Sequence, residues 1–582
     1  MTREPNPEAE RTTWRLWASL AVVVLFQATL FLAFSRFIPG TLGNWDSSAK
    51  VWQQDSLLDG HLDLTYPAKG LDPQERFIPS FYVMRLDGKC YSVYLNFFAL
   101  TTHAATRLVG PIAWNLVSLL SVAVAVFAMM WMAVRHRIVP RRRLWLLLLV
   151  LGCCTPLAVY SLGMVEQPMA SAFVAAAFLL ATSAVGGAEE SPLAPRLWRL
   201  AGAGACLAAA GLTRGECYLF GAALWLVLVG TQARRSPRRA AAMGLALFAG
   251  GAAVLAAWFT VFPWAWRAQF VIAEHGAKVQ FTMLHRYYSL LVEAQPAGRV
   301  SAFLGPLGTS AFRVMACGFL VLGGLLSFFS GGRAALRGMG IALFLLGMFL
   351  VLGLTTLFGG LLAACPLLLV PLFARRRAGL PEDGAVRLIV WTAVLFAFLC
   401  GLLLPNASGS VRYLLPITMP LTVVAVGVVS ASLGLELDRW LRALFILAAV
   451  AGFLINAKNA AQSWGAAKGA TANDRSISAL PAPVLILKDD VLYHSSRILS
   501  KVPCLQVDTP QQLDDVLAML RKNGISTVAV ISHELVREES LRMLHDAGIV
   551  VEREVELTYR GFALIVKVPP GPPVPSVPSA GR

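Results

Sequence analysis

The chain has 582 residues, of which 57% are hydrophobic and 14% are charged, and its mean hydropathy is +0.64. Soluble domains carry roughly a quarter charged residues, so this composition excludes an ordinary soluble protein. The net charge of +17 lies largely in short arginine clusters between apolar runs, a pattern that reports membrane topology and not a nucleic-acid partner. Apolar runs of about 20 residues recur, and they predict a polytopic α-helical membrane protein.

Charge placement predicts a cytoplasmic N-terminus and about 13 transmembrane helices. The helices are expected at about 14–36, 108–134, 144–161, 166–187, 198–212, 216–232, 240–262, 304–330, 338–356, 359–374, 387–404, 412–433 and 439–456. The first span has no small-residue cleavage site, so we expect a retained helix. Residues 1–456 then form one transmembrane domain, with a first outer loop at 37–107 and a second at 263–303.

The first outer loop is expected to contain its own structure. GNWDSSAKVWQQDSLLDG predicts an amphipathic helix at 47–59 that lies at the membrane interface. FYVMRLDGKCYSVYL, at 81–95, alternates around Asp87-Gly88 and predicts a β-hairpin. The second loop begins with the aromatic anchor PWAWRAQF. Two structured outer loops over a helical bundle predict a site that faces outward.

The pattern changes from about residue 457, where short strands alternate with amphipathic helices. The predicted strands are 483–488, 526–532 and 562–568, and the predicted helices are 509–524 and 532–548. This alternation predicts an extracytoplasmic α/β domain at 457–569, followed by a Pro-rich tail without a fold at 570–582. Among nine cysteines, only Cys90 and Cys504 fall in predicted outer segments, where a disulfide is possible.

Two acidic residues mark outer helix ends. Asp46 follows the first span, and Glu166 begins the fourth in GMVEQPMASAF. Asp46 can be the N-cap of the following helix, and Glu166 can be a favourable carboxylate at a helix N-terminus. Asp46 can equally be a catalytic acid at the membrane surface.

Two arginines also lie at predicted outer turns. Arg214 and Glu216 share the turn between two helices, where a local ion pair is the simplest interpretation. Arg412, followed by Tyr413, begins a helix from outside, against both the helix dipole and the usual charge bias. That placement favours a function for Arg412.

These features resemble the GT-C family of polyprenyl-phosphate-dependent glycosyltransferases, in particular the branch with protein O-mannosyltransferases and lipid A aminoarabinose transferases. The resemblance rests on an acid opening a long first loop and on LDGKCYSVYLNFFAL, VEQP, LTRGE and SVRYLLP in this order. It implies a GT-C-like fold of about 13 helices, with Asp46 as catalytic base and Glu166 as a second catalytic carboxylate. The late arginine motif of that family corresponds to Arg412. The predicted substrate-binding residues are Arg412, with Arg214 as second choice for holding the leaving phosphate, together with Tyr413 and Asn44.

The neighbours of Asp46 are Asn44, Trp45 and Ser47, whereas many members of this family have a second acid there. A metal site made by a carboxylate pair is therefore disfavoured, although a divalent cation held by Asp46 and Glu166 stays open. A single carboxylate is sufficient for a general base.

The sequence thus predicts an inverting hexosyl- or pentosyltransferase in the plasma (inner) membrane. A polyprenyl-phosphate-linked sugar is the expected donor, and a hydroxyl of a glycan, lipid or protein is the acceptor. No Walker A motif is present, and AGAGACLAAAG (201–211) is better explained as a helix-packing face than as a dinucleotide loop. The alternatives are a lipid-linked sugar flippase or transporter, which usually carries ionisable residues near the midplane, and a non-catalytic scaffold.

Overall fold

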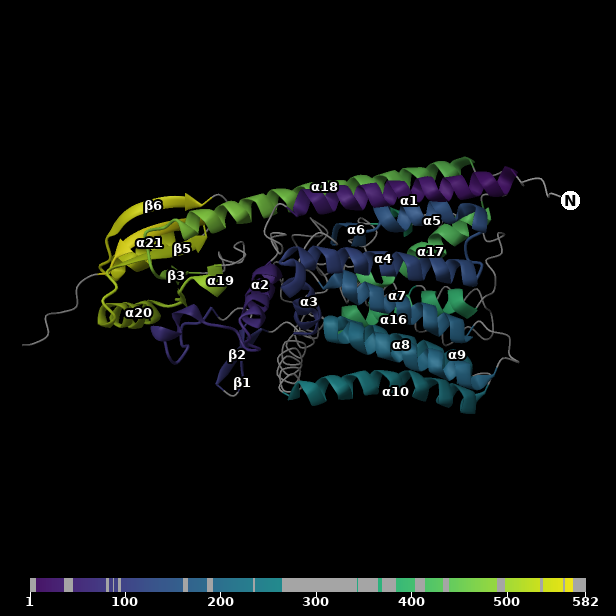
Figure 1. Cartoon of the computed structure of the whole chain (residues 1–582), viewed down its shortest axis with the longest axis horizontal. Helices are drawn as coiled ribbons and strands as arrows, with labels where there is room; N and C mark the ends of the chain where they lie inside the picture. The colour runs from purple at the N-terminus through teal and green to yellow at the C-terminus, as the bar shows by residue number, and fades with distance from the viewer. Residues whose placement is uncertain are drawn as a thin grey trace, which may run out of the picture. The chain divides into compact units, whose positions relative to one another are not determined.

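The protein is represented by a computed structural model, which describes residues 7–35, 45–79, 83–86, 88–92, 96–160, 166–185, 192–233, 236–263, 343, 365–368, 384–403, 414–432, 439–488, 498–533, 537–557 and 561–568 (Figure 1). The chain divides into two compact units. The helical unit consists of Met1–Phe26, Ser121–Ala158 and Gln167–Asn456. The α/β unit consists of Gln27–Leu120, Val159–Glu166 and Ala457–Arg582.

The helical unit is built from long apolar helices. Its elements, some of which continue into the other unit, are α1 (Pro7–Phe34), α4 (Ile112–Arg135), η2 (Arg141–Arg143), α5 (Leu144–Leu149), the π-helix η3 (Val150–Cys154), α6 (Leu157–Tyr160), α7 (Gln167–Val185), α8 (Leu193–Thr213), α9 (Glu216–Ala233), α10 (Pro237–Val261), α16 (Gly384–Leu403), α17 (Leu415–Ser432) and α18 (Arg439–Ser478). Figure 1 shows α7, α8, α9 and α10 lying side by side. Phe178, Phe220 and Phe396 stack edge to face in the core between α7, α9 and α16.

Small residues bring α8 and α10 into close contact. A Cβ atom added at Gly204 would collide with the Leu247 carbonyl, and one at Gly250 would collide with the Ala201 carbonyl. The absence of these side chains lets the two backbones approach, as small residues do between membrane helices. The interpretation of AGAGACLAAAG as a packing face is therefore confirmed.

The prediction of a polytopic membrane protein is confirmed. Six described helices are long and apolar enough to cross a bilayer, namely Thr12–Phe34, Ile112–Arg135, Gln167–Val185, Glu216–Ala233, Pro237–Val261 and Arg442–Ser478. The apolar helices α16 and α17 agree with the spans expected at 387–404 and 412–433. The helices expected at 304–330, 338–356 and 359–374 lie outside the described residues, as does the second outer loop after residue 263, so the total of 13 stays a prediction.

Two helices differ from the predicted spans. The helix expected at 144–161 is interrupted, because Pro156 cannot continue the hydrogen-bond ladder and η3 lies just before it. The last helix was expected to end near 456, but α18 continues to Ser478. Hydropathy falls along 457–478 while alanine keeps the helical propensity high, so the helix continues beyond its apolar part.

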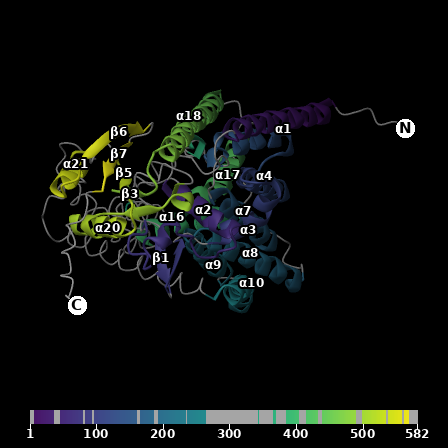
Figure 2. The same ribbon diagram turned by 60° about the vertical axis from the view of Figure 1, so that its left-hand side comes forward.

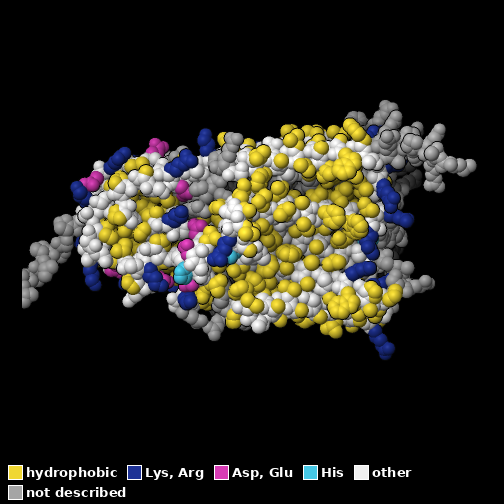
Figure 3. Space-filling model, in the orientation of Figure 1, with side chains coloured by type: hydrophobic (Ala, Val, Ile, Leu, Met, Phe, Trp, Pro, Cys, Tyr) yellow, Lys and Arg dark blue, Asp and Glu magenta, His cyan; other side chains and the backbone are white. Residues whose placement is uncertain are grey.

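Arginine gathers at one end of the helical unit. Arg135 ends α4, Arg196 lies in the first turn of α8, Arg238 lies in the first turn of α10, and η2 is Arg-Arg-Arg. Figure 3 shows Lys and Arg side chains as a dark blue group at the right-hand end of the otherwise hydrophobic helical surface. This is the distribution that the positive-inside rule gives to the cytoplasmic end.

The α/β unit contains a five-stranded mixed sheet in the order β4-β3-β5-β7-β6 (Figure 2). Its strands are β3 (Leu485–Leu487), β4 (Cys504–Gln506), β5 (Thr527–His533), β6 (Val551–Leu557) and β7 (Gly561–Lys567), and its helices are α19 (Ile498–Lys501), α20 (Pro510–Lys522) and α21 (Arg537–Asp546). β3 pairs in parallel with β4 and β5, whereas β7 is antiparallel to β5 and β6. Thr509 caps α20 in a capping box with Gln512.

The C-terminal α/β domain is therefore confirmed, and two of its strands were missed. β4 has only three residues, and no periodicity can be read from so short a segment. β6 has the sequence VEREVEL and lies at the edge of the sheet, where its alternate glutamates stay exposed. The side of the membrane on which this domain lies stays a prediction.

The first loop is part of the α/β unit. It contains α2 (Trp45–Leu58), η1 (Pro67–Gly70), β1 (Val83–Leu86), β2 (Lys89–Ser92) and α3 (Asn96–Val109), a helix that was not expected. β1 and β2 form the predicted hairpin, with Leu86 paired to Lys89 and Gly88 at φ +74° in the turn.

Glu75 fixes the loop between η1 and the hairpin. Its carboxylate accepts hydrogen bonds from the Cys90 thiol, 2.9 Å from Sγ, and from the Lys69 ammonium at 3.0 Å, while Arg85 donates to its carbonyl. Burial by itself raises the pKa of Glu75, but the hydrogen bonds from Cys90 and Lys69 outweigh it and lower that pKa. Cys90 and Cys504 are both buried and free, so they form no disulfide.

Candidate active site on helix α2

Glu166 lies immediately before α7 and is paired with Lys50 of α2. The Lys50 ammonium and the Glu166 carboxylate form an ion pair, with side chains only 4% and 8% exposed. Both residues belong to the α/β unit, although 115 residues separate them along the chain. Two charges are buried together only when they are paired, because the desolvation of either one alone is costly.

Asp46 lies on the same face of α2 as Lys50. It is the second residue of the helix, so it belongs to the first turn and does not precede the helix as an N-cap would. Residues four apart on a helix are neighbours, and Asp46 is four residues before Lys50. The backbone of α2 therefore brings the two acids predicted from sequence, Asp46 and Glu166, to one region of the α/β unit.

Two glutamines continue this face. Gln54 lies one turn after Lys50, and Gln53 lies beside it, so Asp46, Lys50, Gln53 and Gln54 follow one another at i, i+4, i+7 and i+8. We call these four residues the polar stripe. Gln53 is 3% exposed and Gln54 is fully buried.

The buried amides of the polar stripe have unfilled hydrogen-bonding capacity. Among the described residues, no partner is found for Nε2 of Gln53 or for either amide atom of Gln54. A buried polar group without a partner usually costs about 1–3 kcal/mol, so such groups are retained where water or a ligand completes them. An amide that can both donate and accept is well suited to a sugar hydroxyl.

The other sides of α2 are held firmly. Trp52 donates from Nε1 to the Thr65 carbonyl at 2.7 Å, and Ser56 bonds to Thr65 at 3.0 Å. Asp55 accepts a 2.7 Å hydrogen bond from Ser500 of α19. The helix is thus buried on several sides, whereas the sequence predicted a helix lying at the membrane interface.

Arg214 is engaged in a local ion pair. It lies in the turn between α8 and α9, and its guanidinium pairs with Glu216, both residues being buried in the helical unit. The local ion pair expected at this turn is therefore confirmed. A contact between Arg214 and a substrate stays a prediction.

Three predicted substrate residues, Asn44, Arg412 and Tyr413, lie outside the described residues, and so does the side chain of Asp46. Within the described part of the chain, no group of three or more His, Cys, Asp or Glu side chains is positioned to hold a metal ion. A cation at Glu166 would have to share the carboxylate with Lys50.

No protein-family model and no curated protein matches the chain. Among solved structures, the chain is similar to ArnT from Cupriavidus metallidurans bound to undecaprenyl phosphate, at 16% identity and a TM-score of 0.45, over 96% of this chain and 99% of that chain. It is also similar to the archaeal oligosaccharyltransferase AglB from Archaeoglobus fulgidus in complex with an inhibitory peptide and a dolichol-phosphate, at 13% identity and a TM-score of 0.48, over 91% of this chain and 70% of that chain. Identities and scores this low transfer neither an activity nor a site residue.

Proposed function

We propose that this protein is an inverting membrane glycosyltransferase, which moves a sugar from a polyprenyl-phosphate donor to an acceptor hydroxyl on the extracytoplasmic face. The observation that carries the proposal is the burial of Lys50, Gln53 and Gln54 in the polar stripe of α2, with orphaned glutamine amides on the helix that carries the Lys50–Glu166 ion pair. A polar face of this kind is costly in an otherwise apolar chain, and a bound sugar would complete its hydrogen bonds.

Asp46 is the general base of the proposed reaction. It takes the proton from the acceptor hydroxyl while the acceptor oxygen forms a bond to the anomeric carbon of the sugar. The bond from that carbon to the phosphate oxygen breaks, and the polyprenyl phosphate leaves with the electron pair. Attack from the face opposite the leaving group inverts the anomeric configuration.

The remaining candidates bind and orient the substrates. Gln54 bonds to sugar hydroxyls, and Glu166, held in place by Lys50, orients the acceptor. Arg412 holds the departing phosphate, because one guanidinium group can donate two parallel hydrogen bonds to phosphate oxygens. Arg214 is the second candidate for this role. A divalent cation held by Asp46 and Glu166 would help to orient the acceptor hydroxyl beside them.

The proposed setting is the plasma (inner) membrane, with the N-terminus in the cytoplasm and the α/β unit outside. A lipid-linked donor is already in the membrane, so the site needs no nucleotide pocket. The sugar is a hexose or pentose, and the acceptor is a hydroxyl of a glycan, lipid or protein.

The test is sugar transfer by the full chain in proteoliposomes that contain undecaprenyl-phosphate-linked sugars, with the product anomer read by NMR. Release of undecaprenyl phosphate together with an inverted glycoside is the expected result. Labelled donor that crosses the bilayer without being consumed would instead establish a flippase.

Gln54→Leu separates a role in binding sugar from a role in folding. Removing an orphaned buried amide should leave stability unchanged or higher, while transfer falls by about 10-fold or more, the effect of losing one good hydrogen bond. Full transfer by a stable Gln54→Leu variant would exclude the polar stripe from the sugar site.

A further inference from the structure

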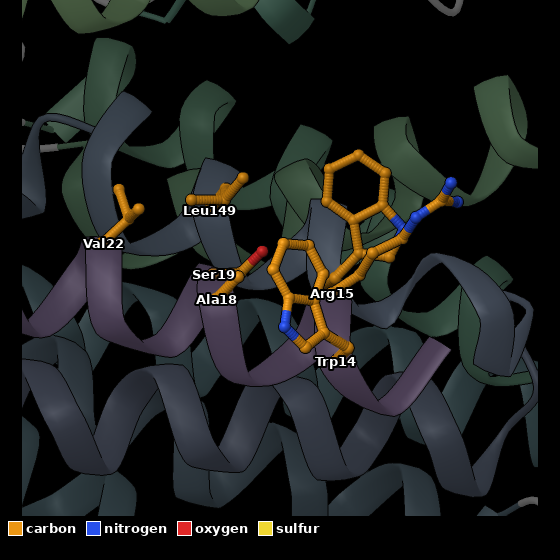
Figure 4. Close-up of a pocket in the computed structure, with 7 residues that line it drawn as sticks. Trp14, Arg15, Ala18, Ser19, Val22 and Leu149 are labelled. Atoms are coloured by element: carbon orange, nitrogen blue, oxygen red, sulfur yellow. The ribbon is translucent and has the colours of Figure 1, made fainter. Parts of the chain in front are cut away.

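A groove of about 460 Å³ lies between α1 and α5 in the helical unit, and none of the residues that line it belongs to the proposed active site (Figure 4). Seven residues line it, namely Trp14, Arg15, Ala18, Ser19, Val22, Trp145 and Leu149. All belong to the helical unit, and nothing in the proposed transfer reaction uses them.

The shape of the groove follows from residue size along one face of α1. Trp14 stands at one end, Ala18 and Ser19 make the low centre, and Val22 and Leu149 continue the apolar wall (Figure 4). Trp14 and Val22 are eight positions apart, which is a rise of about 12 Å and a substantial part of one membrane leaflet. The groove therefore suits an extended hydrocarbon chain lying along α1.

One end of the groove carries the positive charge. Arg15 is the single charged residue among the seven that line it, and its guanidinium carbon lies 6.0 Å from the centre of the Trp145 ring. Trp145 follows the Arg141–Arg143 turn by two residues, and Arg141 and Arg142 are exposed. The groove therefore has a cationic and aromatic end, next to its apolar part.

The groove lies at the arginine-rich end of the helical unit. The basic ends of α4, α8 and α10 mark the same end, which the positive-inside rule assigns to the cytoplasm. Anionic lipids concentrate in the cytoplasmic leaflet, and basic pockets between membrane helices on that side bind their headgroups.

We propose that this groove binds an anionic glycerophospholipid, with its headgroup phosphate at Arg15 and an acyl chain along Ala18, Ser19 and Val22. Charge complementarity selects this occupant over a second copy of the chain. A second helix seated in the groove would cover Arg15 with apolar residues and leave its charge to be desolvated. A phospholipid supplies both the phosphate for Arg15 and the hydrocarbon for the apolar part of the groove.

The test is native mass spectrometry of the full-length protein titrated with dioleoyl phosphatidylglycerol and, separately, with dioleoyl phosphatidylcholine. Arg15→Gln should weaken the binding of phosphatidylglycerol about fivefold, the effect of one basic residue near an anionic lipid. The matched control is Arg238→Gln, at the same basic end on α10 but outside the groove, which should leave binding within about twofold.

A second variant tests the apolar part of the groove. Ala18→Trp fills the centre of the groove and should reduce the binding of phosphatidylglycerol while leaving the charge intact. Equal losses in Arg15→Gln and Arg238→Gln would overturn the proposal, because they would indicate general charge attraction. Unchanged binding in both groove variants, or a dimer that persists with no lipid bound and is broken by Ala18→Trp, would overturn it as well.

Discussion

The buried Lys50–Glu166 ion pair gives the sharpest prediction of stability. Glu166→Gln removes the negative charge that is paired with the buried Lys50 ammonium, where the two side chains are only 4% and 8% exposed. Breaking a pair at this depth costs about 3–5 kcal/mol, whereas an exposed pair contributes about 0–1 kcal/mol. We therefore expect Glu166→Gln and Lys50→Met each to lower the free energy of unfolding by about 3 kcal/mol or more.

The double variant Lys50→Met/Glu166→Gln removes both charges, and it should recover much of the loss. The measurement is a double-mutant cycle from denaturant unfolding of the full chain in detergent. Asp59→Asn is the matched control, because Asp59 is exposed just beyond the C-terminal end of α2 and should cost less than about 0.5 kcal/mol. Single-variant losses below about 1 kcal/mol would show that water reaches the pair, and the buried site argued for α2 would be refuted.

Three further predictions concern other parts of the two units. Gly204→Ala forces a methyl group against a backbone carbonyl and should cost about 1–3 kcal/mol in thermal unfolding, whereas Gly230→Ala meets no atom within 4 Å and should stabilise α9 by about 0.5–1 kcal/mol. Folding lowers the pKa of Glu75, so the ionised carboxylate stabilises the folded protein fully above pH 4.5, and this contribution is lost as the pH falls below that value. In Glu75→Gln, the free energy of unfolding should lose this part of its dependence on acid pH. Thr509→Ala should cost about 1 kcal/mol in denaturant unfolding through loss of the capping box of α20.

The reactivity of Cys90 gives a test that needs no substitution. Burial, together with the hydrogen bond to Glu75, raises the pKa of the Cys90 thiol to about 12, so little thiolate is present near neutral pH. Iodoacetamide should label Cys90 slowly in the folded protein and readily after unfolding, as peptide mass spectrometry can show. Fast labelling of Cys90 in the folded chain would contradict its burial and its hydrogen bond to Glu75. For the glycine pair, equal unfolding temperatures of Gly204→Ala and Gly230→Ala would contradict the close packing of α8 on α10.

The fold could be predicted to a large extent because its signals are local. The length of the apolar runs predicted the membrane helices, and the Asp87-Gly88 turn predicted the hairpin. The errors also have local causes. Hydropathy cannot locate the end of α18, since an alanine-rich helix continues past the apolar part, and it cannot detect the interruption at Pro156 within an apolar run.

The candidate site was only half predictable. Asp46 and Glu166 stood out as acids at helix ends, but Lys50, Gln53 and Gln54 were missed. Their spacing from Asp46 places them on one helix face, yet a polar face is ordinarily the solvated one. Only the tertiary fold shows that Lys50, Gln53 and Gln54 are buried and that Lys50 meets a residue 116 positions further along the chain.

The most direct test of the proposed site is the turnover of Asp46→Asn at saturating lipid-linked donor, compared with Asp59→Asn. The substitution keeps size and removes the base, so turnover should fall by about 10²–10⁴-fold while the fold and donor binding persist. Asp59→Asn, the same chemical change just beyond α2, should retain wild-type turnover. Full turnover by a folded Asp46→Asn variant would contradict the assignment of Asp46 and, with it, the active site proposed on α2.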